Sequence, residues 1–363
     1  MQRSAAARPT APLALPADIA ALLQRFSLTL ETLLTDSNPK LAKGSAVARG
    51  AILHHLPARA LAAAVTPGTV APTAPRSYLA ALAALADREG VAALARRHNG
   101  CPWATAGCAA GCLNWAGHGG LSPAVAAARG RRTLAMLADP HTYGRAVLWA
   151  VARQWARAQA EGLPLAVRLR GTDEGPAVGW HRLALTVTPA EAQTVARRFG
   201  LPLSLGDGVA HTLSAALSVP IAEGTLTLYD YSKAPLSGPL GLSAQRAAGW
   251  DVTASMAADR ATAAADAMAA LGAGFRLAVP VALAKGQALP RTLTLSAPDR
   301  PPLTVPCVDG DATDHRWRDP SGAAVILRTK CSRGADAALA APFSLAPMAL
   351  PQALADGVAT LAW

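Results

Sequence analysis

The chain has 363 residues, of which 52% are hydrophobic and 16% are charged. This length can bury a large core in one large domain or two smaller ones. Apolar periodic segments recur up to the C-terminus, which excludes a chain that is disordered throughout. No run of 18 apolar residues lacks charges or proline, so we expect no transmembrane helix. The first 16 residues contain three prolines and no continuous apolar stretch, and they do not resemble a signal peptide.

The formal net charge is +11, and part of the excess is local. Between residues 129 and 170 there are eight arginines and two acidic residues. This pattern predicts a basic face that binds nucleic acid through its phosphates. The alternative explanation is general solubility combined with codon bias. The predicted nucleic-acid-binding residues are Arg129, Arg131, Arg132, Arg145, Arg153 and Arg157.

Apolar periodicity predicts helices over residues 17–35, 78–98, 129–138 and 143–160, with a linker at residues 66–76. Further along, short β-rich segments predict strands over residues 165–170, 225–230, 251–255, 275–283, 305–308 and 323–328. A predicted helix over residues 260–271 lies among them. Strands that alternate with helices favour a parallel sheet.

The predicted fold is therefore α/β, with a partial or complete (β/α) barrel-like parallel sheet and an N-terminal helical extension. We assign residues 1–76 to that extension and its linker, and residues 77–335 to the α/β core. The core contains a cysteine loop at residues 101–120 and an insertion at residues 175–224. Residues 336–363 form a C-terminal tail in this division.

Polar residues follow two of the predicted strands, where barrels and open α/β sheets place their sites. After the first strand, Arg168, Gly171 and Thr172 are predicted to hold an anionic group of a cofactor or substrate, and Asp173 follows them. After the second strand, Asp230 and Lys233 are the predicted catalytic partners of Asp173. The alternative at both places is a capped turn. We predict that Asp173, Asp230 and the cysteine loop lie at the same end of the sheet.

A second polar cluster lies near the C-terminal end of the core. Several carboxylates this close together in the sequence are suited to bind Mg²⁺ or Mn²⁺, as in metal-dependent nucleases. The alternative is turn chemistry, since Asp-Gly and Asp-Pro favour turns. The cluster consists of Asp309, Asp311, Asp314, His315 and Asp319.

Three cysteines lie close together in a glycine-rich segment, at Cys101, Cys108 and Cys112. The five cysteines of the chain are an odd number, and a chain of this length does not need disulfides, so we expect a reducing cytoplasmic compartment. Three thiolates suit an iron–sulfur cluster with one open iron, or zinc with a fourth ligand. That ligand would come from His118, Cys307 or Cys331. The alternative is that the cysteines pack inside as free thiols.

The cysteine segment, residues 101–120, resembles a phage and plasmid family named after a mycobacteriophage gene product 88. The resemblance extends over roughly residues 36–335 and implies no particular activity. Its further matches, in chain order, are Asn38–Leu41, Leu56–Ala58, Arg129, Arg131–Thr133, Val167–Asp173, Tyr229–Lys233, Val308–Asp311, Asp314, Arg316 and Asp319–Pro320.

The order of three cysteines followed by a run of βα units is also remotely similar to that of radical-SAM enzymes. In those enzymes three cysteines bind a four-iron cluster, and the open iron binds S-adenosylmethionine. This resemblance implies an iron–sulfur cofactor used with S-adenosylmethionine. Here six and three residues separate the cysteines, instead of three and two, and Gly171–Glu174 stands in place of a Gly-Gly-Glu motif.

Three functions follow as competing predictions. The first is a radical-SAM-like iron–sulfur protein, with nucleic acid as one candidate substrate. The second is a zinc-stabilised nucleic-acid-binding protein without catalysis. The third is a metal-dependent nuclease that uses the cluster from Asp309 to Asp319.

Overall fold

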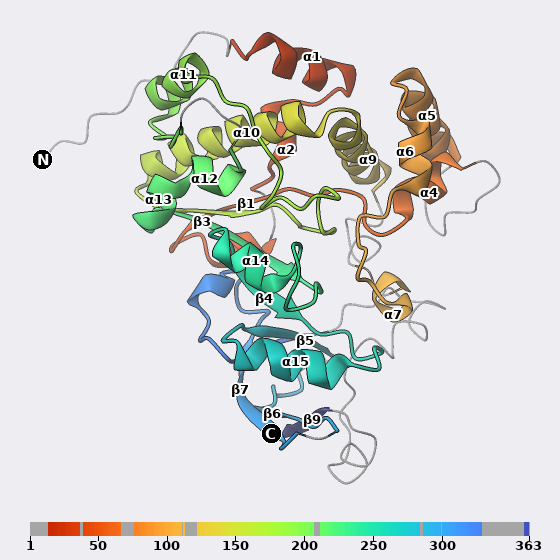
Figure 1. Cartoon of the computed structure of the whole chain (residues 1–363), viewed down its shortest axis with the longest axis vertical. Coiled ribbons are helices and arrows are strands. Elements are labelled where there is room, and N and C mark those ends of the chain that lie inside the picture. Colours follow the sequence, from red (N-terminus) through yellow and green to blue (C-terminus); the bar gives the residue numbers. More distant parts are fainter. Residues whose placement is uncertain are drawn as a thin grey trace, which may run out of the picture.

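The described residues form a sheet of nine strands, which is the framework of the fold (Figure 1). The computed structural model describes residues 14–36, 39–66, 76–110, 112, 122–206, 211–283, 286–298, 300–328 and 359–362, without the side chains of residues 39–40, 76–79 and 110. In spatial order the strands are β1 (Arg49–Ile52), β2 (Leu165–Arg168), β3 (Leu226–Ser232), β4 (Asp251–Ser255), β5 (Leu277–Val281), β8 (Ala324–Arg328), β7 (Leu303–Asp309), β6 (Thr292–Leu295) and β9 (Ala359–Ala362).

The sheet is mostly parallel. Each neighbouring pair from β1 to β5 is parallel, as are the pairs that β8 makes with β5 and β7. Only β6 runs antiparallel to its neighbours, β7 and β9. The α/β fold with a largely parallel sheet is thus confirmed.

Both faces of the central strands are covered, which explains their continuous apolar sequences. Every residue of β5 is buried, as are Leu165, Ala166 and Val167 of β2. Leu165 and Val167 join the main core, whereas Ala166 packs on the opposite face with Tyr229. The segment around a short 3-10 helix, η1 (Arg316–Arg318), covers that second face.

The longest helix, α10 (Pro140–Glu161), lies between the sheet and α1 (Ala17–Arg25) (Figure 1). It begins where the Asp139 side chain accepts a hydrogen bond from the backbone of Thr142, and it ends at Gly162, whose φ of 70° is left-handed. The remaining helices are α2 (Leu30–Leu33), α3 (Pro39–Lys43), α4 (Ala60–Val65), α5 (Arg76–Arg88), α6 (Ala92–Arg97), α7 (Ala106–Ala110), α9 (Pro123–Ala138), α11 (Pro189–Phe199), α12 (Leu213–Ala216), α13 (Ser218–Ala222), α14 (Leu242–Ala247) and α15 (Ala263–Gly272).

The structure divides two predicted helices. Ser27, with a φ of 50°, separates α1 from α2 inside the segment predicted as one helix. Gly90, with a φ of 68°, separates α5 from α6 in the same way. Most of the predicted linker at residues 66–76 lies outside the described residues.

Both ends of the chain contribute strands that the sequence analysis did not predict. β1 lies within residues 1–76, which were assigned to a helical extension, and it pairs along its length with β2. β9 lies within the assigned tail and pairs with β6. Among the described residues no helix is long and apolar enough to cross a membrane.

Candidate functional site

The loops that follow β1 and β2 are joined at the C-terminal edge of the sheet. The backbone N–H of Gly171, after β2, donates a hydrogen bond to the carbonyl of Leu53, after β1, at 2.9 Å. A Cβ at Gly171 would lie 2.3 Å from the His54 ring and 2.7 Å from the Ile52 side chain. The close approach of the two loops therefore requires glycine at this position.

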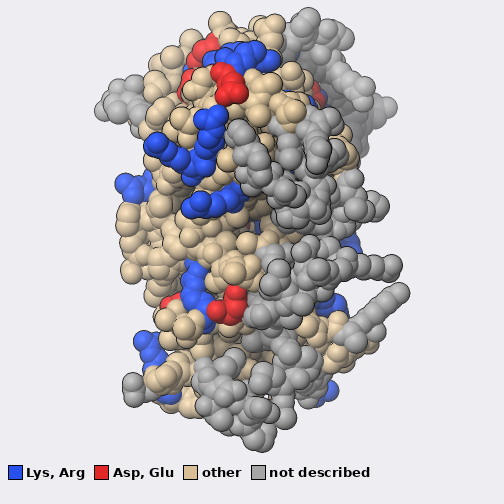
Figure 2. Space-filling model, turned by 90° about the vertical axis from the view of Figure 1, so that its right-hand side faces the viewer, with Lys and Arg blue, Asp and Glu red and all other residues tan. Residues whose placement is uncertain are grey.

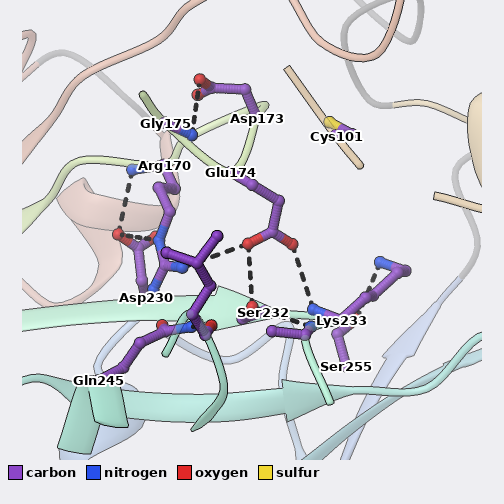
Figure 3. Close-up of polar contacts among 12 residues, drawn as sticks. Cys101, Arg170, Asp173, Glu174, Gly175, Asp230, Ser232, Lys233, Gln245 and Ser255 are labelled. Atoms are coloured by element: carbon purple, nitrogen blue, oxygen red, sulfur yellow. Dashed lines mark hydrogen bonds and ion pairs between the residues drawn. The ribbon is translucent and has the colours of Figure 1, made fainter. Parts of the chain in front are cut away.

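The first part of the cysteine loop lies against the same edge. The Sγ of Cys101 is 3.8 Å from the carbonyl oxygen of Thr172, and the N–H of Glu174 donates to the carbonyl of Gly100 at 2.6 Å. Cys101 is therefore beside the loop that follows β2, which agrees with the predicted shared edge (Figure 3).

The next part of the loop is held by the segment that follows β4. The carboxylate of Asp259 accepts hydrogen bonds from the Thr105 hydroxyl at 2.7 Å and from the N–H of Gly107 at 3.0 Å. Thr105 in turn accepts from the N–H of Cys108 at 3.2 Å, at the start of α7. Asp259 was not among the predicted site residues, because no sequence motif marks it. These contacts hold residues 100–108 between the ends of β2 and β4.

Cys101, Cys108 and Cys112 are all partly buried and are not in disulfides among the described residues. Burial, and to a smaller degree the charges of Asp173 and Cys112, raise the pKa of Cys101. Within the described part of the chain, no three His, Cys, Asp or Glu side chains are arranged to hold a metal ion. The candidate fourth ligands His118 and Cys331 lie outside the described residues.

Asp173 lies in a buried chain of polar groups. Its Oδ2 accepts from the N–H of Gly175 at 2.9 Å and lies 3.2 Å from Nδ1 of His55. Nε2 of His55 is 3.0 Å from the hydroxyl of Tyr143. Among the described residues, Nδ1 of His55, Oδ1 of Asp173 and Nε2 of His98 have no hydrogen-bond partner, so the contact between His55 and Asp173 is a close approach and not a hydrogen bond. The arrangement places groups that can hold a proton close to Cys101.

Asp230 is fully buried and holds the backbone at the end of β2. Its Oδ2 accepts from the N–H groups of Leu169 at 3.2 Å and Arg170 at 3.1 Å. Its Oδ1 is 3.4 Å from Nε of Arg168, a residue that also contacts Asp314. Burial raises the pKa of Asp230, against the effects of Arg170 and Arg168. These contacts give Asp230 a positioning role, and they pair Nε and Nη1 of Arg168 with the carboxylates of Asp230 and Asp314.

Glu174 joins the ends of β2 and β3 (Figure 3). Its carboxylate accepts from the Ser232 hydroxyl at 2.9 Å, from the N–H of Lys233 at 3.1 Å and from Nη1 of Arg170 at 3.2 Å. The ammonium group of Lys233 donates to the Ser255 hydroxyl, at the end of β4, at 3.1 Å. The Glu174 carboxylate is thus the centre of the polar network at this edge.

Glu174→Ala is expected to lower the free energy of unfolding by about 2 kcal/mol, because it leaves partly buried donors without their charged acceptor. Urea denaturation followed by circular dichroism measures the change. Glu223→Ala removes an exposed carboxylate and is the control, with an expected effect within about 0.5 kcal/mol. Equal effects of the two substitutions would contradict the central position of Glu174.

The predicted basic face is not assembled as expected. Arg129 and Arg132 are buried, and Arg132 donates to the carbonyls of Thr32 and His54. Three others, Arg145, Arg153 and Arg157, form ion pairs with acidic residues of the N-terminal segment, namely Asp18, Glu31 and Asp36. On the face in Figure 2, Lys and Arg form small separate groups, some beside acidic side chains. These arginines mainly fasten the N-terminal segment to α9 and α10.

The carboxylates of the C-terminal cluster contact different partners. Asp314 accepts from the hydroxyls of Tyr229 at 3.1 Å and Tyr231 at 3.2 Å, on the covered face of the sheet. Asp309 and Asp311 lie near Arg328, and Asp319 pairs with Arg316. Each of these carboxylates thus has a protein partner of its own, as the turn explanation predicts.

Cys307 lies on β7, where it packs against the main core. Burial raises its pKa to about 12, and no other cysteine contributes to that shift. Because the thiolate is the reactive form, Cys307 is expected to react with iodoacetamide at pH 8 at least about tenfold more slowly than a small free thiol. Peptide mass spectrometry of timed samples measures the rate, and a rate equal to that of glutathione would contradict the burial.

Comparison with known families gives one match. The family model described as gene product 88 matches residues 32–182. The matched segment contains β1, the cysteine loop, β2 and Glu174, and it ends before β3. Comparisons with curated proteins and with solved structures give no match. Residues 32–182 are thus similar to the gene product 88 family, and no match links the chain to radical-SAM enzymes.

Proposed function

We propose that the protein is an iron–sulfur enzyme in which Cys101, Cys108 and Cys112 hold one cluster at the C-terminal edge of the sheet. One observation carries the proposal: the part of the loop with Cys101 and Cys108 is held between the ends of β2 and β4, beside the segment of Asp173 and Glu174. Parallel α/β sheets place their sites at this edge.

The three thiols are chemically suited to bind an iron–sulfur cluster. Thiolates are the ligands of iron–sulfur clusters, and the loop supplies three of them. Burial and the charge of Asp173 raise the pKa of Cys101, so its thiol is protonated without metal and must lose that proton on binding. No ready triad of ligands exists among the described residues, so binding would draw the three thiols together.

A cluster held by three thiolates would leave one iron open to a small molecule, for which the radical-SAM resemblance suggests S-adenosylmethionine. Residues of the chain would orient the small molecule that binds the open iron. Glu174 holds the ends of β2 and β3 in register, and Lys233 presents a positive charge beside Ser255. His55 and Asp173 would hold a proton in the buried chain that reaches Tyr143.

Anaerobic purification, followed by a visible absorption spectrum and quantitation of iron, zinc and acid-labile sulfide, tests the proposal. A brown protein with iron and sulfide in equal amounts is the expected result. A colourless protein with one equivalent of zinc would replace the proposal with a structural zinc site. A protein without bound metal would reject both.

A further inference from the structure

The cysteine loop has two anchors, which come from different strands of the sheet. The N–H of Gly100 donates to the carbonyl of Ala58, in the loop after β1, at 2.8 Å, and the carbonyl of Gly100 accepts from Glu174, after β2. The turn that carries Cys108 is held by the segment after β4. The positions of Cys101 and Cys108 therefore depend on different contacts.

The helix α7, which carries Cys108, is too short to be stable by itself. It has five residues, and one of them is Gly107, a residue of low helix propensity. Forming the first turn of a helix fixes several backbone dihedral angles for a single hydrogen bond, so an isolated turn is unfavourable. The order of α7 must therefore come from contacts outside it.

Asp259 supplies such contacts at the start of α7. Its carboxylate accepts from the Thr105 hydroxyl at 2.7 Å and from the N–H of Gly107, a buried residue, at 3.0 Å. Oγ1 of Thr105 accepts from the N–H of Cys108 at 3.2 Å, as the side chain of an N-cap residue does. A helix start leaves its first N–H groups without partners inside the helix. Asp259 satisfies one of these groups directly and supports a second through Thr105.

Arg260, the next residue, adds a contact to the preceding part of the loop. Its Nη2 donates to the carbonyl of Trp103 at 2.7 Å. Two adjacent residues of one segment thus hold the loop at residues 103, 105 and 107. We infer that Asp259 is a positioning residue for Cys108, which fixes this thiol at the edge of the sheet independently of the anchor of Cys101.

Hydrogen exchange of the full-length protein in the presence of a chelator, measured by mass spectrometry, tests the anchoring itself. In Asp259→Ala, exchange in peptides that cover residues 102–110 is expected to be at least about tenfold faster, because hydrogen bonds to a charged acceptor are lost. Peptides that cover residues 165–173 should exchange as in the unmodified protein. Unchanged exchange at residues 102–110, or equal acceleration in both segments, would overturn the inference, since equal acceleration indicates only a loss of global stability.

Two conservative variants decide the question if Asp259→Ala does not fold. Asp259→Asn retains one of the two acceptor oxygens, and Thr105→Val removes the hydroxyl between Asp259 and Cys108. Both should accelerate exchange at residues 102–110, and no acceleration in either would overturn the inference. Asp87→Asn, at an exposed position on α5, removes the same charge and is the control, which should change neither segment.

The consequence for metal binding rests on the proposed function. If the loop holds iron, Asp259→Asn should lose it to bipyridine at least about tenfold faster than the unmodified protein, whereas Asp87→Asn should lose it at the unmodified rate. Faster exchange with an unchanged rate of iron loss would overturn the positioning role of Asp259. Absence of iron from the unmodified protein would reject the proposed function, and the exchange experiment would still decide whether Asp259 anchors Cys108.

Discussion

Cys101→Ser, Cys108→Ser and Cys112→Ser are each expected to abolish metal binding almost completely, whereas Cys307→Ser should retain it. A serine hydroxyl is a poor substitute for a thiolate, and the loss of one of three protein ligands removes much of the binding free energy. Cys307 lies on β7, and its pKa shows no influence from the other cysteines. Metal content after anaerobic purification, measured for all four variants, shows the difference.

The pattern among the variants matters more than any single loss. If only two of the three loop cysteines are needed, the third is not a ligand. If Cys307→Ser also loses the metal, the centre has four cysteine ligands and no open iron, which would contradict the proposed binding of a small molecule.

Asp314→Ala is expected to lower the free energy of unfolding by about 3–5 kcal/mol, because it removes the acceptor of a buried ion pair. Asp314 is 2% exposed and accepts from Tyr229 and Tyr231. It also lies 3.4 Å from Nη1 of Arg168. Burial lowers the pKa of Arg168, whereas Asp314 and then Asp230 raise it. Because arginine stays charged in proteins, the substitution leaves a buried guanidinium with one ion-pair partner fewer.

Asp309→Ala is the matched control from the same segment. The Asp309 side chain is 40% exposed and lies 3.7 Å from Arg328, so its loss should cost no more than about 1 kcal/mol. Urea denaturation of both variants gives the comparison. Similar costs for the two aspartates would contradict the structural role of Asp314 and reopen a shared metal-binding role for the cluster.

The sequence predicts the central strands well because short segments rich in β-forming residues lie between turn-forming residues. β4 lies at the predicted residues 251–255, and β2, β3, β5, β7 and β8 overlap their predicted segments. β1, with the sequence Arg-Gly-Ala-Ile, is short and contains glycine, and its place in the sheet depends on pairing with β2, which is more than 100 residues away. Local patterns do not contain that information.

The candidate site was predictable in position but not in its contacts. Polar residues at strand ends indicated Asp173, Asp230 and Lys233, and the structure brings their segments to one edge with Cys101. His55 was missed, although a histidine pair directly after the apolar segment Ala51–Leu53 is a usable signal for a strand end.

The predicted basic face shows where counting charges is misleading. The local excess of arginine is real, but the compensating acids, Asp18, Glu31 and Asp36, lie more than 100 residues earlier in the chain. Glu191, after the arginine-rich segment, pairs with Arg145 at 2.7 Å. A local stretch of sequence cannot show the ion-pair partners that the fold brings to it from other parts of the chain.

X-ray absorption at the iron edge of the anaerobically purified protein distinguishes an iron–sulfur cluster held by the three loop cysteines from any other metal centre. For such a cluster we expect iron surrounded by sulfur, with a short iron–iron distance, and loss of that signal in Cys108→Ser but not in Cys307→Ser. A spectrum with isolated metal bound by nitrogen and oxygen, or a protein that contains no iron, would contradict it.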